Sequence, residues 1–156
     1  KHNKQQQQQH IMSSSSLNPA PSKYQQVAEA YGTAMTKAMI DSDISTLKSL
    51  FISTEPVTVV LQSADGEELG FSISDTIENS TMTWDDFLQV AQKDLAEQDY
   101  AKTVSECCGI LGDRMIMTSG RINQQDECTH EAFFILTLNE EGLIVTMEAF
   151  SNIHAP

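Results

Sequence analysis

The sequence has few basic residues and no long apolar run, and each shortage excludes a class of protein. Nine Lys and Arg residues are set against 22 Asp and Glu residues, so the formal net charge is −13 at pH 7. This charge repels phosphates and anionic lipids, and we expect neither nucleic acid nor a membrane surface as a partner. The longest apolar stretch, residues 132–136, is far shorter than the roughly 20 residues of a membrane-spanning helix.

Cysteine is also scarce, with only Cys107, Cys108 and Cys128. Cys107 and Cys108 are neighbours in a predicted strand, where adjacent side chains point to opposite faces and are poorly placed to form a disulfide. No C-x-x-C or paired-histidine spacing indicates zinc, and no glycine-rich nucleotide motif is present. We therefore expect reduced thiols that pack as small apolar side chains, no metal and no cofactor.

Residues 1–21 form a tail rich in Gln and Ser. The tail has too little apolar surface to offset the entropy of ordering, and we expect it to be disordered. One domain over residues 22–154 accounts for the rest of the chain. No signal peptide is visible, which favours the cytoplasm, but the chain starts at Lys1, as it would after removal of an upstream segment.

Apolar residues at helical spacing predict three helices. Ser22 and Gln25 fit a capping box at the start of the first, over residues 23–40. Residues 41–43 interrupt this pattern and offer a new N-cap for a short second helix that extends to Phe51. Thr83 with Asp86 resembles the start of a third helix, over residues 84–97.

Strand patterns fill the remainder of the domain. Residues 57–62 and 69–74 flank a turn at Asp65-Gly66. Further strands are predicted over 102–111, 114–122, 128–138 and 143–152, and three consecutive long strands joined by short polar turns make an antiparallel meander. Helices first and strands later indicate an α+β domain, with the helices on one face of a bent sheet.

Two segments resemble a known family. Residues 35–51, MTKAMIDSDISTLKSLF, combine a helix, an acidic break and a helix that ends in an aromatic residue, and residues 137–152, TLNEEGLIVTMEAFSN, form a tight turn at Gly142 and a final strand. They are similar to the nuclear transport factor 2-like (NTF2-like) superfamily, which includes SnoaL-like polyketide cyclases and ketosteroid isomerases. The resemblance implies a cone, in which N-terminal helices pack on a curved antiparallel sheet around an apolar pocket. Neither segment is catalytic, so together they indicate fold rather than function.

The acid–base residues of ketosteroid isomerases are missing from this sequence. In an ungapped alignment with that family, the helix Tyr corresponds to Met35, the strand Asp falls within residues 59–61, and the second Asp corresponds to Phe134. All of these positions are apolar, which excludes steroid isomerisation by that mechanism.

The same alignment predicts which side chains face into the cone. Tyr31 and Met35 would face in from the helix, while the strands would contribute Met115, Met117, Ser119, His130, Ala132, Phe134, Leu136, Met147, Ala149 and Ser151. The predicted ligand-binding set is Tyr31, Met35, Met115, Met117, Ala132, Phe134, Met147 and Ser151. Methionine adapts to varied apolar ligands, although these side chains could equally fill the cone as ordinary core.

His130 is the main candidate for chemistry, because an imidazole titrates near neutral pH. Ser119 or Arg121 on the neighbouring strand could assist it; alternatively, His130 lies at the open sheet edge and bonds to water or a loop carbonyl. Arg121 could bind a carboxylate through its two-pronged guanidinium, or it could pair with an acid such as Glu127 or Glu131. The acidity of the chain favours the ion pair.

The opposite face of the predicted sheet points to a homodimer. Glu148 alternates with Met147 and should face away from the pocket, and a group of apolar and neutral side chains shares its face: Phe133, Ile135, Ile144, Thr146 and Phe150. Such a face usually marks an interface, and the family resemblance implies dimerisation through the same sheet.

Three functions remain open on the sequence. The first is a pocket that binds a small hydrophobic metabolite without converting it. The second is a SnoaL-like enzyme, a cyclase, isomerase, dehydratase or hydrolase, that uses His130. The third is a homodimerisation or protein-docking module with a filled cone.

Overall fold

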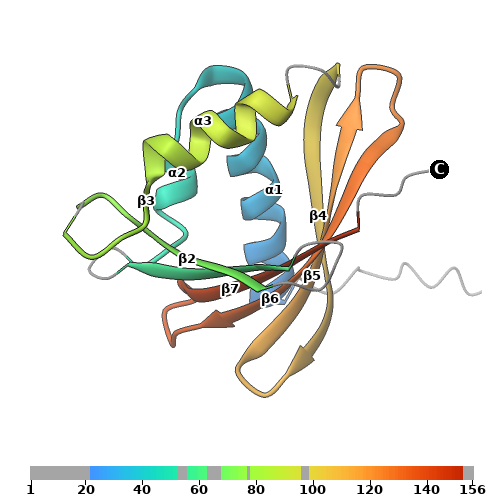
Figure 1. Ribbon diagram of the computed structural model, residues 1–156. Helices are drawn as coiled ribbons and strands as arrows, with labels where there is room; N and C mark the ends of the chain where they lie inside the picture. The colour runs from blue at the N-terminus through green and yellow to red at the C-terminus, as the bar shows by residue number, and fades with distance from the viewer. Residues whose placement is uncertain (1–21, 53–55, 63–67, 77, 96–98, 153–156) are drawn as a thin grey trace, which may run out of the picture.

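The computed structural model describes residues 22–52, 56–62, 68–76, 78–95 and 99–152. The predicted tail and the Asp65-Gly66 turn lie outside these ranges. The elements follow in the order α1 (Lys23–Asp41), α2 (Ser45–Lys48), β1 (Val57–Gln62), β2 (Glu68–Ser74), β3 (Met82–Thr83), α3 (Trp84–Leu95), β4 (Tyr100–Leu111), β5 (Arg114–Asn123), β6 (Cys128–Leu138) and β7 (Ile144–Asn152). All three helices lie on the concave face of one curved sheet (Figure 1).

The sheet has seven strands in the order β3-β2-β1-β7-β6-β5-β4. The predicted meander is present and includes four strands, since β4, β5, β6 and β7 pair antiparallel in succession. Two pairs are parallel, β1 with β7 and β2 with β3, so the sheet is mixed. The expected α+β cone, with helices packed on a curved sheet, is confirmed.

Local side-chain bonds explain where the helices begin. Ser22 Oγ accepts a hydrogen bond from the Gln25 backbone N at 3.2 Å, as the capping box predicts. At α3 the box is reciprocal: Thr83 Oγ1 accepts from Asp86 N, and Asp86 Oδ2 accepts from Thr83 N, each at 3.1 Å. The second helix is shorter than predicted, since α2 is a single turn of four residues that ends at Lys48.

Helix α1 covers the free edge of strand β4. Thr36 Oγ1 accepts a hydrogen bond from the Thr103 backbone N at 2.9 Å, and Gln25 Oε1 accepts from Cys107 N at 3.1 Å. The side chain of Gln25 therefore binds the sheet instead of closing its own capping box. An uncovered strand edge is a site of aggregation, and side chains of α1 accept from two backbone N–H groups of this edge.

The burial of Ile144 and of two cysteines differs from the sequence prediction. Ile144 is fully buried rather than outward-facing, because a register shift separates the Thr137 and Leu138 pairings and the backbone of Ile144 bonds to Leu50 and Ile52. Only Cys107 packs against the core; Cys108 and Cys128 are exposed. Cys108 follows the inward-facing Cys107, so the alternation of side chains along β4 points it away from the packed face, and it is the extra residue of a β-bulge.

Candidate functional site

The residues predicted to face into the cone share one face of the sheet. Met117 on β5 lies opposite Phe134 on β6, which lies opposite Ala149 on β7. Met115, Leu136 and Met147 form the next row, and all six of these side chains are buried. The side chain of Ser151 lies outside the described residues.

The apolar part of this face is packed with side chains from α1. The rings of Tyr31 and Phe134 are 5.8 Å apart between centroids, and Met35 is half-buried against the same hydrophobic cluster. Neither of the two cavities described below is lined by a member of the predicted ligand-binding set. Ligand contact by that set stays a prediction.

One end of the concave face is polar, and we call its residues the polar cluster. They are Tyr31, Tyr100, Thr103, Ser105, Ser119, Arg121 and His130. Strand register places them in rows: Thr103 lies opposite Arg121, which lies opposite His130, and Ser105 lies opposite Ser119. The Ser105 hydroxyl donates to Ser119 Oγ at 2.9 Å, and the hydroxyls of Tyr100 and Thr103 are 2.7 Å apart.

Tyr31 contributes a neutral phenol to the polar cluster. Its side chain is 3% exposed, and burial raises the pKa of the phenol far above its ordinary value. The positive charge of Arg121 lowers the pKa of the Tyr31 phenol, but its effect is smaller than that of burial. At neutral pH Tyr31 can therefore donate a hydrogen bond, but it cannot act as a base.

Arg121 and His130 lie directly opposite each other on β5 and β6, and both are half-buried. The predicted ion pair of Arg121 with Glu127 or Glu131 is wrong, because neither carboxylate lies within pairing distance of it in the described part of the chain. Glu127 accepts from Asn123 Nδ2 at 3.2 Å, and Glu131 is exposed and alternates with His130 onto the convex face. Ser119, the other proposed assistant of His130, is bonded to Ser105.

Two cavities adjoin the polar cluster. The first, of about 310 Å³, lies between α1, α3 and the start of β4 and is lined by Met39, Ile40, Gln92, Leu95, Asp99 and Tyr100. The second, of about 510 Å³, lies between α1 and β4 and is lined by Thr33, Thr36, Lys37, Ile40, Asp41, Lys102 and Thr103. Ile40 lines both cavities, and the bonded pair of Tyr100 and Thr103 connects them to the cluster.

Sequence reasoning missed these lining residues. The predicted strand began at Lys102 and so excluded Tyr100, which a register shift just before Lys102 brings to the same face as Thr103. Ile40 is 58% exposed at the end of α1 and lies outside the apolar stripe of the helix, whose pattern did not show that a cavity adjoins it.

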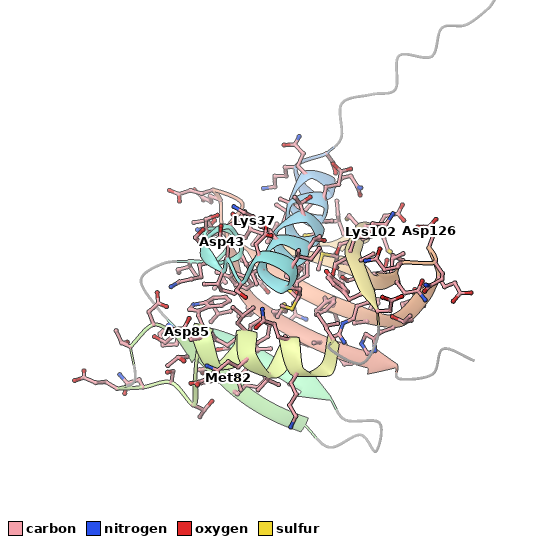
Figure 2. All side chains as sticks on the ribbon, turned by 90° about the horizontal axis from the view of Figure 1, so that it is seen from above. Lys37, Asp43, Met82, Asp85, Lys102 and Asp126 are labelled. Atoms are coloured by element: carbon pink, nitrogen blue, oxygen red, sulfur yellow. The ribbon has the colours of Figure 1, made fainter. Side chains whose placement is uncertain are left out.

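Ion pairs surround the second cavity. Lys37 Nζ lies 2.7 Å from Asp43 Oδ2, and Lys102 Nζ lies 3.3 Å from Asp126 Oδ1 (Figure 2). Hydrogen bonds from Lys37 and Ser45 lower the pKa of Asp43 to about 2. Both lysines that line the cavity are therefore already neutralised by acids of the same chain.

Among the side chains that the structure describes, no three His, Cys, Asp or Glu residues gather closely enough to hold a metal ion. Within the same ranges, no helix has the length and apolar character that crossing a bilayer requires.

No protein-family model and no curated protein matches this sequence. Solved structures do match. A SnoaL-like family protein from Agrobacterium tumefaciens strain C58, described as a candidate isomerase, has a TM-score of 0.59 and 12% identity, over 85% of this chain and 99% of that one. An NTF2-like protein of unknown function from Exiguobacterium sp. 255-15 has a TM-score of 0.46 and 17% identity, over 80% and 97%. A SnoaL-like protein of unknown function from Burkholderia thailandensis E264 has a TM-score of 0.39 and 11% identity, over 81% and 98%.

Proposed function

We propose, on the basis of the NTF2-like fold of this chain, that the domain binds a small hydrophobic metabolite where α1, α3 and β4 meet. The observation that carries the proposal is the cavity of about 310 Å³ beside the polar cluster. Its volume lies at the lower end of the range for small-molecule sites, roughly 300–1,000 Å³.

The lining of this cavity suits a mostly apolar ligand. Met39, Ile40 and Leu95 offer aliphatic surface, and Met39 is a flexible side chain that can adapt to the shape of a ligand. Gln92, Asp99 and Tyr100 supply the polar half of the lining, and the Asp99 carboxylate accepts from Gln125 Nε2 at 3.0 Å. Gln92 Nε2 also donates to Ser42 Oγ at 3.0 Å, a bond that holds α3 against the end of α1.

Native mass spectrometry of the protein purified from its own source tests the proposal. We expect a small molecule to be retained, and the ¹³C-methyl signal of Met39 to shift when that molecule is added to ligand-free protein. Shifts confined to Met115, Met117 and Met147 would place the ligand in the predicted cone wall instead. If the purified protein carries no small molecule and its methyl signals shift with no apolar compound, the result would favour the docking module with a filled cone.

A variant can block the cavity without disturbing the core. Ile40→Trp enlarges a side chain that is 58% exposed and lines both cavities, so we expect binding to weaken at least about tenfold while the fold is kept. Val90→Trp is the matched control, because Val90 is 54% exposed on α3 and lines neither cavity. Equal affinities for the two variants would contradict this site.

A second proposal is a SnoaL-like enzyme that uses His130. The position of His130 opposite Arg121, with the Tyr31 phenol close enough to sense the arginine charge, favours it. The imidazole would act as acid or base, and the phenol and guanidinium would stabilise a developing negative charge. Turnover of the retained molecule that is unchanged by His130→Ala would rule this mechanism out.

A further inference from the structure

We propose that the ligand is a hydrophobic carboxylic acid and that Arg121 binds its carboxylate. This inference rests on the proposed binding function and specifies the class of ligand.

Arg121 is placed to reach the inside of the cone. Side chains alternate along β5 without a break from Met115 through Met117 and Ser119 to Arg121, and the first three are buried under α1. Arg121 therefore shares their face. Its charge acts on the buried Tyr31 phenol, which places the guanidinium on the same side of the sheet as α1.

The described acids at this end of the sheet are engaged elsewhere. Asp99 accepts from Gln125 Nε2 at 3.0 Å, and Asp126 pairs with Lys102 at 3.3 Å. Glu127 accepts from Asn123, and Glu131 belongs to the opposite face. In a chain of net charge −13, this half-buried cation has no carboxylate partner among the described side chains. A bound ligand that carries a carboxylate would supply this partner for Arg121.

A carboxylate suits the neighbouring groups. A guanidinium donates two parallel hydrogen bonds to a carboxylate, and the neutral Tyr31 phenol can donate a further one. Arg121 lines neither cavity, but Thr103, which lies opposite it, is bonded to Tyr100, a lining residue of the first cavity. The apolar remainder of the ligand would lie there against Met39 and Leu95. A cationic ligand would be repelled by Arg121, and a wholly polar one would leave the aliphatic lining unused.

A matched pair of compounds tests the inference on the unmodified protein. 2-Naphthylacetic acid and 2-naphthylacetamide have nearly the same shape and differ in charge. We expect the acid to bind about tenfold or more tightly than the amide in calorimetric titrations, as hydrogen bonds to ionised groups are the stronger ones. Equal affinity for the two compounds would overturn the inference and leave the proposed function standing. Failure of both to bind at millimolar concentration would overturn both proposals.

Variants then assign the effect to Arg121. Arg121→Gln should weaken binding of the acid much more than binding of the amide and so abolish the preference, and Arg121→Lys should keep part of the preference. Lys102→Gln, which removes a nearby surface cation that is paired with Asp126, is the matched control and should keep all of it. Loss of the preference in Lys102→Gln but not in Arg121→Gln would overturn the assignment. The ¹³C-methyl spectrum of each variant would show whether the variant is folded like the original protein.

Discussion

At Gly32, α1 approaches β4 more closely than residues with a Cβ usually do. A Cβ built there would lie 3.0 Å from the Ser105 backbone N and 3.1 Å from the Thr103 backbone O. These are backbone atoms of a paired strand, so they cannot rotate away as the end of a flexible side chain could. The close approach brings Thr36 within hydrogen-bond distance of β4.

Gly32→Ala should therefore destabilise the protein, although alanine is the better helix former by about 1 kcal/mol. Overpacking typically costs about 1–3 kcal/mol, so we expect the free energy of unfolding in urea to fall by up to about 2 kcal/mol. Thr33→Ala, on the exposed side of the same helix, is the control and should change it by less than about 0.5 kcal/mol. A higher free energy of unfolding in Gly32→Ala would contradict the prediction, because it would mean that α1 can shift away from β4 without destabilising the protein.

Asp43 predicts a pH dependence at the end of α1. Its pKa is lowered from 3.8 to about 2 by hydrogen bonds from Lys37 and Ser45. Because the unfolded state binds the proton more readily, the stabilising contribution is present above pH 3.8 and is lost as the pH falls towards 2.

Asp43→Asn should remove this part of the pH dependence. We expect the urea midpoints of the two proteins to differ at about pH 5 and to converge as the pH approaches about 2. Lys37→Gln removes the partner with the largest effect and should weaken the same dependence. Parallel curves for the original protein and Asp43→Asn over this range would contradict the prediction.

At the scale of elements, the contact between α1 and β4 holds the candidate site together. Thr36 Oγ1 donates to the Gly32 carbonyl of its own helix at 2.8 Å and accepts from Thr103 N at 2.9 Å. Thr103 in turn bonds to Tyr100, which lines the first cavity. A change at Thr36 should therefore affect both stability and the strand edge beside the cavity.

Thr36→Val keeps the shape of the side chain and removes the acceptor for Thr103 N. Leaving this amide unpaired should lower the free energy of unfolding by about 1–3 kcal/mol. Hydrogen exchange at the Thr103 amide should also become faster. Thr33→Val is the matched control, because the Thr33 hydroxyl bonds only to the Glu29 carbonyl within α1. An unchanged exchange rate at the Thr103 amide would mean that a water molecule accepts its hydrogen bond as well as the Thr36 hydroxyl does.

At the scale of the molecule, the two faces of the sheet differ in what covers them. Helices cover the concave face, whereas the convex face carries the Phe133 and Phe150 rings, 5.8 Å apart, with Phe133 38% exposed. Glu148 also lies on the convex face, as predicted, where its carboxylate is 3.9 Å from Arg114 Nη2. We propose that a second copy of the chain covers this face.

Sedimentation velocity tests the dimer. We expect the protein to sediment as a dimer at micromolar concentration and Phe133→Lys to sediment as a folded monomer, because a charge would be buried in the interface. Val90→Lys, at an apolar position on α3 that is 54% exposed, should remain dimeric. A monomeric original protein would rule the dimer out.

The sequence by itself determined the main elements and the alternation of side chains along the long strands, but not the short strand β3 or the end of α2. The capping residues Ser22 and Thr83 mark where two helices begin, and Gly142, with a φ of +84°, permits the last turn. Side chains alternate along a strand with a period of two, which placed Met115 and Met117 on one face of their strand, and the alignment with the resembled family added Phe134 of the next strand to the same side. It failed at Ile144, where a register shift interrupts the alternation.

Only the tertiary structure decided which residues meet. Arg121 lies opposite His130 because of the register between β5 and β6, and neither residue's position along the chain specifies that register. Thr36 and Thr103 are 67 residues apart, and the cavity beside them exists only where α1, α3 and β4 converge. Local patterns specify local structure, whereas a site built from three elements depends on how they pack.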